Sequence, residues 1–496
     1  MRRHALLAAY AWLGPIALAG CITTPRTFTC PRAGGPPWHE ISSEHFILHT
    51  DLPSAEAGRL LGRVERLRAA LVAGLPGGTT PASGRVDVIA FRTAEEYQPF
   101  SPGNTFGYYI RYDGGSPRIV IPGEFGPLQH AMLAHEITHD LLAAKYKRRP
   151  RWFAEGLAVY METVRDGADG TVTVGGAPRE RLDTARSSRV SVSELLRWDG
   201  SPGQRQMLDY YAGSWLLVHW LVHARPAAFE TMGRLLAAGV APETAWRAAL
   251  PDVDPDDPQA LLALDGALTV YLQGRLPTEE RECHSPAAVG YFEQDLSTPE
   301  MHAIRLEIWQ FGAGKDVRRL RAEVQETLQE DPANPTALEY LAGLDRVDPL
   351  PLARRAVAGH PNDPRAHIFL ASALQGPAHA AEREQAFRRA AELAPRNPAA
   401  LHNLADELFA SGKLGEALPV AEKAAALAPW STPILAGYAA VLSGLGRCSE
   451  AIRIQQRAIE AIPDRDTDAQ RNALSRTLAA YADTCRLAGE GGRVGQ

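Results

Sequence analysis

Prolines recur at a fixed interval near the end of the chain, and this interval constrains the fold more than any other sequence feature. Pro361, Pro395, Pro429 and Pro463 follow one another at a spacing of 34 residues. If each proline is position 32 of a unit, positions 8 and 27 are always alanine: Ala371, Ala405 and Ala439, then Ala390, Ala424 and Ala458. A repeat of about 20–50 residues is typical of arrays in which each unit packs on its neighbours. We therefore predict an array of stacked, largely helical units.

Two further observations refine the array. Position 20 is alanine in two units, Ala417 and Ala451, but arginine at Arg383, so the unit that contains Arg383 is degenerate. Asp331-Pro332, 29 residues before Pro361, suggests an earlier, shortened unit. The pattern resembles the tetratricopeptide repeat, a helix pair of about 34 residues, and this resemblance implies that the alanines lie where the helices cross closely. The resemblance implies an all-α solenoid over residues 301–490, clearest over 364–465, that binds a protein or peptide partner in its concave face.

The first 21 residues have the proportions of a secretion signal. Arg2 and Arg3 precede an apolar run that is too short to span a membrane, and the run ends in Leu18-Ala19-Gly20-Cys21. An ordinary cleaved signal would also fit this pattern. The last four residues resemble a bacterial lipobox, which implies removal of residues 1–20 and acylation of Cys21. By the same resemblance, Ile22 in the next position implies the periplasmic face of the outer membrane.

The remaining cysteines pose a disulfide question. Residues 21–40 are rich in Pro, Gly and Thr and are predicted to form a tether. In an oxidising compartment Cys448 and Cys485 are the better candidates for a disulfide, and Cys30 and Cys283 form the second candidate pair. Buried thiols are the alternative.

Residues 41–275 are predicted to form an α+β domain, because strand patterns come first and helical patterns follow. Residues 276–300 lack a clear period and are predicted to be a linker. The segments 166–190 and 198–207 are predicted to be loops that cover a site. A hairpin is expected around 113–115. The predicted strands are 45–50, 85–91, 105–112 and 118–121, and the predicted helices are 54–75, 127–146, 151–163, 190–197, 208–223, 227–237 and 258–273.

Charge argues against a nucleic-acid partner. The chain has 52 Lys and Arg against 58 Asp and Glu, a net charge of −6, and therefore lacks the basic excess that such partners require.

The predicted helix 127–146 contains His135-Glu136-Ile137-Thr138-His139. Two histidines four residues apart stand on one helical face, so both His135 and His139 can present a ring nitrogen to one Zn²⁺ ion. Glu136 lies beside them and can take a proton from an attacking water molecule. The motif predicts a hydrolytic zinc site.

A catalytic zinc site needs a third protein ligand, and the following segment offers one. It reads Pro150-Arg-Trp-Phe-Ala-Glu155-Gly-Leu-Ala158, and a helix that begins there runs back past the first helix and places Glu155 beside the metal. HExxH followed by this segment resembles the peptidase MA-like, or gluzincin, zinc metallopeptidases over residues 40–225. The resemblance implies a zincin-like fold with His135, His139 and Glu155 as ligands and Glu136 as the general base.

Other roles follow from the same resemblance. Tyr211, with Tyr210 as the alternative, would donate a hydrogen bond to the oxyanion. The second-shell aspartate of other branches is replaced by Val159, which leaves the partner of the ligands unidentified; Asp140 is one possibility. A peptide substrate would extend along an edge strand, for which 118–121 is the first candidate and 105–112 the second. His45, His49 and His130 are expected to have no catalytic role.

These observations predict a lipid-anchored zinc metallopeptidase of the cell envelope whose repeats recruit a substrate or a partner. The alternative is a non-catalytic assembly or scaffold lipoprotein with a relic peptidase fold. A weaker third hypothesis is a zinc hydrolase that acts on a non-peptide amide.

Overall fold

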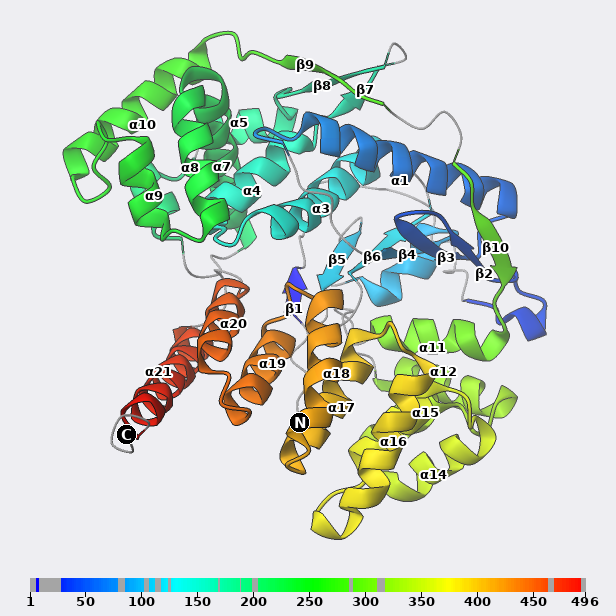
Figure 1. Cartoon of the computed structure of the whole chain (residues 1–496). Helices are drawn as coiled ribbons and strands as arrows, with labels where there is room; N and C mark the ends of the chain where they lie inside the picture. The colour runs from blue at the N-terminus through cyan, green and yellow to red at the C-terminus, as the bar shows by residue number, and fades with distance from the viewer. Residues whose placement is uncertain are drawn as a thin grey trace.

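The computed structural model describes residues 6–8, 28–78, 85–101, 107–111, 117–123, 126–167, 170–187, 189–198, 204–284, 289–309, 317–462 and 468–491 (Figure 1). Cys21, Ile22, the predicted hairpin turn 113–115 and Pro463 lie outside these residues, as does the side chain of Cys485.

A mixed sheet forms the centre of the first domain. Its seven strands follow the order β1-β5-β6-β4-β3-β2-β10. β3, β4 and β6 run parallel, and the outer strands on both sides pair antiparallel. The strand bounds are β1 Leu6–Ala8, β2 His39–Ser42, β3 Phe46–Thr50, β4 Val86–Phe91, β5 Tyr108–Arg111, β6 Arg118–Pro122 and β10 Phe292–Asp295.

This strand order corrects the prediction of the edge strand. The segment 118–121 belongs to β6, which lies between β4 and β5 and therefore has no open edge. β5, the second candidate, is the next strand outward, and β1 pairs with its outer side. The order of strands depends on long-range pairing, which the alternation of apolar residues does not encode.

The sheet is covered on both faces because its central strands alternate two sets of apolar side chains. Val88 and Ala90 of β4 belong to the core shared with α1 (Ser54–Gly74) and α3 (Pro127–Lys145). Ile89 and Phe91 point to the opposite face. There they join a second core with residues of α11 (Thr298–Trp309). Figure 1 shows α1 and α3 above the sheet and α11 below it.

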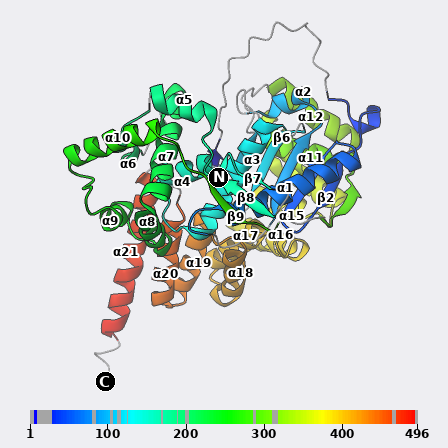
Figure 2. The same cartoon turned by 90° about the horizontal axis from the view of Figure 1, so that it is seen from above.

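The remaining elements of the first domain form a helical lobe and a small sheet, seen on the left of Figure 2 and at its centre. The helices of the lobe are α4 Arg151–Met161, α5 Arg179–Ser187, α6 Val192–Leu196, α7 Gln204–Ala224, α8 Pro226–Ala238, α9 Pro242–Ala249 and α10 Pro258–Gln273. The short helix α2 Ala94–Tyr97 lies apart from them, against β4 and β6 of the large sheet. β7 Arg165–Asp166, β8 Thr171–Val174 and β9 Glu279–Glu282 pair antiparallel in the order β7-β8-β9.

Three predicted irregular segments are more ordered than expected. The predicted linker 276–300 contains β9 and β10, which complete the two sheets; their sequences, EERE and FEQD, are polar and give no apolar period. The predicted cover 166–190 contains β8 and α5. The predicted tether includes the short 3-10 helix Pro31–Ala33, and Trp38 is 1% exposed within the core beneath the sheet.

Beyond α11 the chain is a series of paired helices that curve along the lower side of Figure 1. The six alanines at positions 8 and 27 are at most 2% exposed, which confirms the predicted close crossings. At position 20, Arg383 instead donates to both carboxylate oxygens of the buried Glu407 on α17 (Pro398–Ala410). The helices are α12 Val317–Glu330, α13 Pro335–Asp345, α14 Pro349–Gly359, α15 Pro364–Ala373, α16 Ala380–Leu393, α17 Pro398–Ala410, α18 Leu414–Leu427, α19 Thr432–Gly444, α20 Cys448–Glu460 and α21 Asp468–Gly491.

The structure contradicts one of the two predicted disulfide bonds. Cys30 and Cys283 are thiols in separate surroundings, so the prediction of a bond between them is wrong. Cys448 is disulfide-bonded. Among the helices of the described ranges, none combines the length and the apolar character needed to cross a bilayer.

Candidate metal centre

Helices α3 and α4 form an αα-hairpin that carries the predicted ligands. α3 ends at Lys145, and Pro150 directly precedes α4, where its fixed φ of −54° suits the entry into a helix. α4 then packs against α7, and this approach is close: a Cβ atom on Gly156 would lie 2.5 Å from the backbone oxygen of Ser214. Glycine at this position therefore allows the residue before it, Glu155, to face α3.

The three predicted ligands converge on one point. The Nε2 atoms of His135 and His139 lie 3.1 Å apart, and Glu155 Oε2 lies 3.4 Å from the first and 3.3 Å from the second. Tetrahedral zinc with bonds of about 2.0–2.2 Å separates neighbouring ligand atoms by about 3.3–3.5 Å. The triangle formed by these side chains therefore fits one face of a zinc tetrahedron. The structure brings together all three residues that the sequence predicted.

The orienting partner of His135 is Glu162, which sequence reasoning missed. Nδ1 of His135 donates to Glu162 Oε1 over 3.0 Å, and this leaves Nε2 facing the other ligands. Arg181 of α5 lies 3.6 Å from the same carboxylate oxygen. Glu162 follows Glu155 by seven residues, or two helical turns, and this spacing is the signal that would have identified it.

The sequence pointed to two other positions for this role, Val159 and Asp140, and the structure gives each of them different contacts. Val159 is an apolar core residue. Asp140 accepts a hydrogen bond from the hydroxyl of Tyr109 on β5, with a distance of 3.4 Å.

The centre carries an excess of negative charge. Burial opposes ionisation of His135, but hydrogen bonds with Glu155 and Glu162 outweigh it and raise the pKa of this imidazole to about 10; the charge of Glu136 acts in the same direction. Burial likewise acts to raise the pKa of Glu155, but His139 and His135 hold it well below its usual range. Groups that favour a positive charge so strongly also favour a bound cation.

Glu136 and Tyr211 lie in the same buried region. Glu136 is 1% exposed, and the ring of Tyr211 lies 6.2 Å from the ring of His135. The Arg181 guanidinium is 5.3 Å from the Tyr211 ring centroid. Tyr210, the alternative, packs against Trp198 with its ring 4.7 Å away. Tyr211 therefore has its ring next to a candidate ligand.

The other histidines singled out in the sequence have partners of their own. His45 pairs with Glu65 over 2.8 Å, His49 with Glu40 over 3.1 Å, and His130 Nε2 lies 3.0 Å from the backbone oxygen of Val164.

Comparisons with known proteins bear on the repeats. Residues 408–476 match the family model described as tetratricopeptide repeat. Solved structures similar to the chain include TTC0263, a thermophilic repeat protein of Thermus thermophilus, with 20% identity over 37% of this chain and 98% of that one and a TM-score of 0.28. YrrB, described as a repeat protein with an unusual peptide-binding site, is 15% identical over 37% of this chain and 90% of that one, with a TM-score of 0.28. Yeast Tom70 is 16% identical over 62% of this chain and 64% of that one, with a TM-score of 0.31. No curated protein matches the chain.

These TM-scores are too low to carry an argument, so the assignment rests on the family match and on the helix pairs themselves. The C-terminal part of the chain is an array of tetratricopeptide-type repeats. Arrays of this kind are protein-interaction or scaffolding modules, and the array implies a protein partner at the repeat domain.

Proposed function

We propose that the chain is a zinc-dependent hydrolase of peptide bonds whose repeat array recruits the substrate or a partner protein. The observation that carries the proposal is the triangle of His135, His139 and Glu155, whose edges of 3.1–3.4 Å match the ligand spacing of zinc. The carboxylate of Glu162 behind His135 adds the outer-shell support that is usual in zinc sites.

Zinc held by these three residues would activate water and polarise the scissile carbonyl. Glu136 follows His135 directly and is buried beside the centre, so it is placed to take the proton of the attacking water and to pass it to the leaving amine. Tyr211, with its ring next to His135, would donate to the oxygen that gains charge.

The position of β5 supports an extended substrate. β5 pairs antiparallel with β6 on one side, and its other side accepts the backbone of β1. A peptide that adds to β5 in the place of β1 would lie next to Tyr109, which donates to Asp140, the residue after the ligand His139. This would bring the peptide alongside the helix that carries the ligands.

One alternative function has an observation of its own. The family match covers the repeats and leaves residues 41–275 outside, and this favours a non-catalytic assembly or scaffold protein that acts through the array. Against this, a relic site has no need to keep both ligands and base, whereas His135, Glu136, His139 and Glu155 are all present.

Zinc content and peptide cleavage decide between the two functions. Protein purified without chelators is measured for zinc by elemental analysis and incubated with a peptide library, together with Glu136→Gln. We expect zinc in both proteins and cleavage by the wild type alone. Zinc without cleavage by the wild type supports the scaffold, and equal cleavage by Glu136→Gln contradicts the assigned base.

We also propose an envelope location, with a lipid anchor at Cys21. Cells that express wild type and Cys21→Ser are fractionated and blotted. The variant should move from the membrane to the soluble fraction, and an unchanged distribution would refute the anchor.

A further inference from the structure

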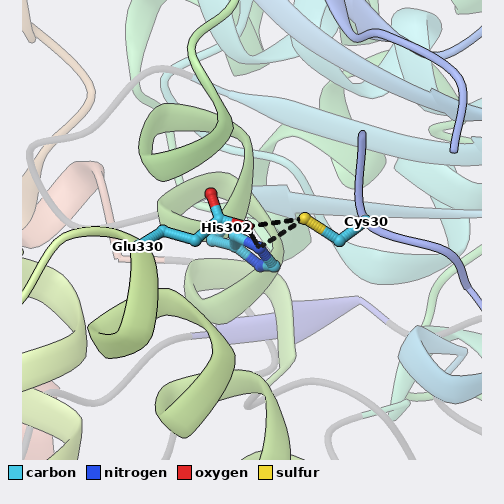
Figure 3. A group of neighbouring side chains, drawn as sticks. All are labelled: Cys30, His302 and Glu330. Atoms are coloured by element: carbon cyan, nitrogen blue, oxygen red, sulfur yellow. Dashed lines mark hydrogen bonds and ion pairs between the residues drawn. The ribbon is translucent and has the colours of Figure 1, made fainter. Parts of the chain in front are cut away.

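A second group of metal-type donors joins the N-terminal segment to the start of the helical array. Cys30 lies just before the short helix Pro31–Ala33, His302 is on α11, and Glu330 is the last residue of α12. Figure 3 shows the three side chains pointing toward one another. Cys30 Sγ lies 3.7 Å from His302 Nε2 and 2.8 Å from Glu330 Oε1, and His302 Nε2 lies 4.0 Å from the same oxygen.

His302 is held in the form that binds a metal. It is fully buried, and its Nδ1 donates to Glu323 Oε1 over 2.7 Å. Arg305 donates to both oxygens of Glu323, over 2.7 and 3.0 Å, and fixes that carboxylate in turn. A proton committed to Nδ1 leaves the lone pair on Nε2, directed at Cys30 and Glu330.

The surroundings are short of positive charge. Glu323, Glu326 and Glu330 are spaced i, i+3 and i+7 and therefore lie on one face of α12, but the guanidinium of Arg305 is engaged by Glu323. Burial and then the charge of Glu323 raise the pKa of Glu326; His302 and Arg305 act in the opposite direction but do not outweigh them, and Glu330 adds to the rise. Burial, the hydrogen bond to Glu330 and its charge raise the pKa of the Cys30 thiol to about 11.

These features argue against a nucleophilic Cys30. A catalytic cysteine needs a lowered pKa, whereas here a carboxylate oxygen of Glu330 lies 2.8 Å from the sulfur and raises the pKa of the thiol. A divalent cation removes the conflict: it displaces the thiol proton, and the thiolate and Glu330 together balance its two charges. Phe28 covers one side of the cluster: its ring lies 6.0 Å from the His302 ring, and the Arg305 guanidinium is 3.5 Å from the Phe28 centroid.

We propose that Cys30, His302 and Glu330 bind a structural Zn²⁺ ion that fastens the N-terminal segment to α11 and α12. With zinc bonds of about 2.3 Å to sulfur and 2.0–2.1 Å to nitrogen, these two ligand atoms are about 3.6 Å apart, close to the 3.7 Å between Cys30 and His302. The 2.8 Å contact of Cys30 with Glu330 is a hydrogen bond that opens when the metal replaces the proton. A water molecule or the second oxygen of Glu330 completes the coordination.

Cobalt distinguishes this site from the centre at His135, because only this one contains sulfur. Full-length chain with Cys21→Ser is stripped of metal and titrated with Co²⁺ alone, and the near-ultraviolet absorption of a cobalt–thiolate bond is recorded. We expect this absorption to saturate at one cobalt per chain when the centre at His135 is disabled by His139→Ala, and to be lost in Cys30→Ser. His139→Ala should keep it, so that a failure of the proposed peptidase site does not affect the outcome.

Two further variants complete the test. Cys283→Ser, which removes the buried thiol on the other side of the domain, should keep the full absorption. Glu330→Gln keeps the Cys30 thiol and should weaken cobalt binding about tenfold or more, which tests the site even if Cys30→Ser fails to fold. Absence of thiolate absorption in the parent protein, or its persistence in folded Cys30→Ser, would overturn the proposal.

Discussion

The contact between His135 and Glu162 makes a quantitative prediction about zinc affinity. Nδ1 of His135 lies 3.0 Å from Glu162 Oε1, Glu162 is 3% exposed, and Arg181 stands 3.6 Å behind it. Outer-shell carboxylates of this kind change metal affinity by about 10–100-fold. We expect Glu162→Gln, which keeps an oxygen but loses the charge, to weaken zinc binding about 10-fold. Glu162→Ala, which loses both, should weaken it about 100-fold. This corresponds to about 1.4–2.7 kcal/mol of binding free energy.

The assay is a competition between the protein and a zinc-binding dye. All variants carry Cys30→Ser, so that the thiol does not contribute. Asp140→Asn is the control: it removes the carboxylate charge of the residue that directly follows His139 in the sequence, and that carboxylate accepts a hydrogen bond from Tyr109. We expect Asp140→Asn to bind zinc within about twofold of its parent. If Asp140→Asn weakens zinc binding and Glu162→Ala does not, the assignment of Glu162 as the orienting partner is refuted.

Three other predictions concern stability. Gly156→Ala places a Cβ 2.5 Å from a backbone oxygen of α7 and should lower the free energy of unfolding by about 1–3 kcal/mol. Gly266→Ala, where the Cβ meets open space on α10, should raise the free energy of unfolding by about 0.4–1 kcal/mol. The midpoints of urea denaturation compare the two variants. Ala424→Leu, in a fully buried helix crossing, should cost a similar 1–3 kcal/mol, and no loss in urea denaturation would contradict the crossing. Burial and then the charge of His223 lower the pKa of His219 to about 4, so the unfolded chain binds a proton between about pH 6.5 and 4 that the folded chain does not. The free energy of unfolding should therefore decrease by up to about 3 kcal/mol as the pH is lowered across this window. In His219→Gln this decrease should be smaller, which thermal melting at a series of pH values measures.

Local spacing explains why the ligands could be predicted from the sequence. His135 and His139 are one helical turn apart, and Glu155 follows in the next helix, so a single αα-hairpin determines all three positions. The repeats could also be predicted from the sequence, because each unit packs on its neighbours in the same way and the same residues therefore recur at a fixed interval. Both features depend on contacts between residues close in the chain.

Features that depend on distant segments could not be predicted in this way. Arg181 reaches Glu162 only because α5 packs on α7, which also packs on α4, and nothing in the loop pattern of 166–190 indicates that helix. β9 and β10 complete two sheets with mostly polar residues, so the usual alternation was missing from their sequences. The edge strand was misassigned for a related reason: strand order is a property of the whole sheet.

The shared core beneath the sheet determines how the repeat array is attached to the first domain. Trp309 at the end of α11 packs edge-on against Phe100 at 5.3 Å, and Arg118 of β6 reaches Glu307 of α11 over 3.0 Å. β6 is also the strand that leads into α3, the helix of His135 and His139. An interface built on buried aromatic residues resists the hinge motion expected of a flexible linker. A partner held by the array would therefore meet the first domain in a fixed orientation, set by the same packing that positions the strand before the ligand helix.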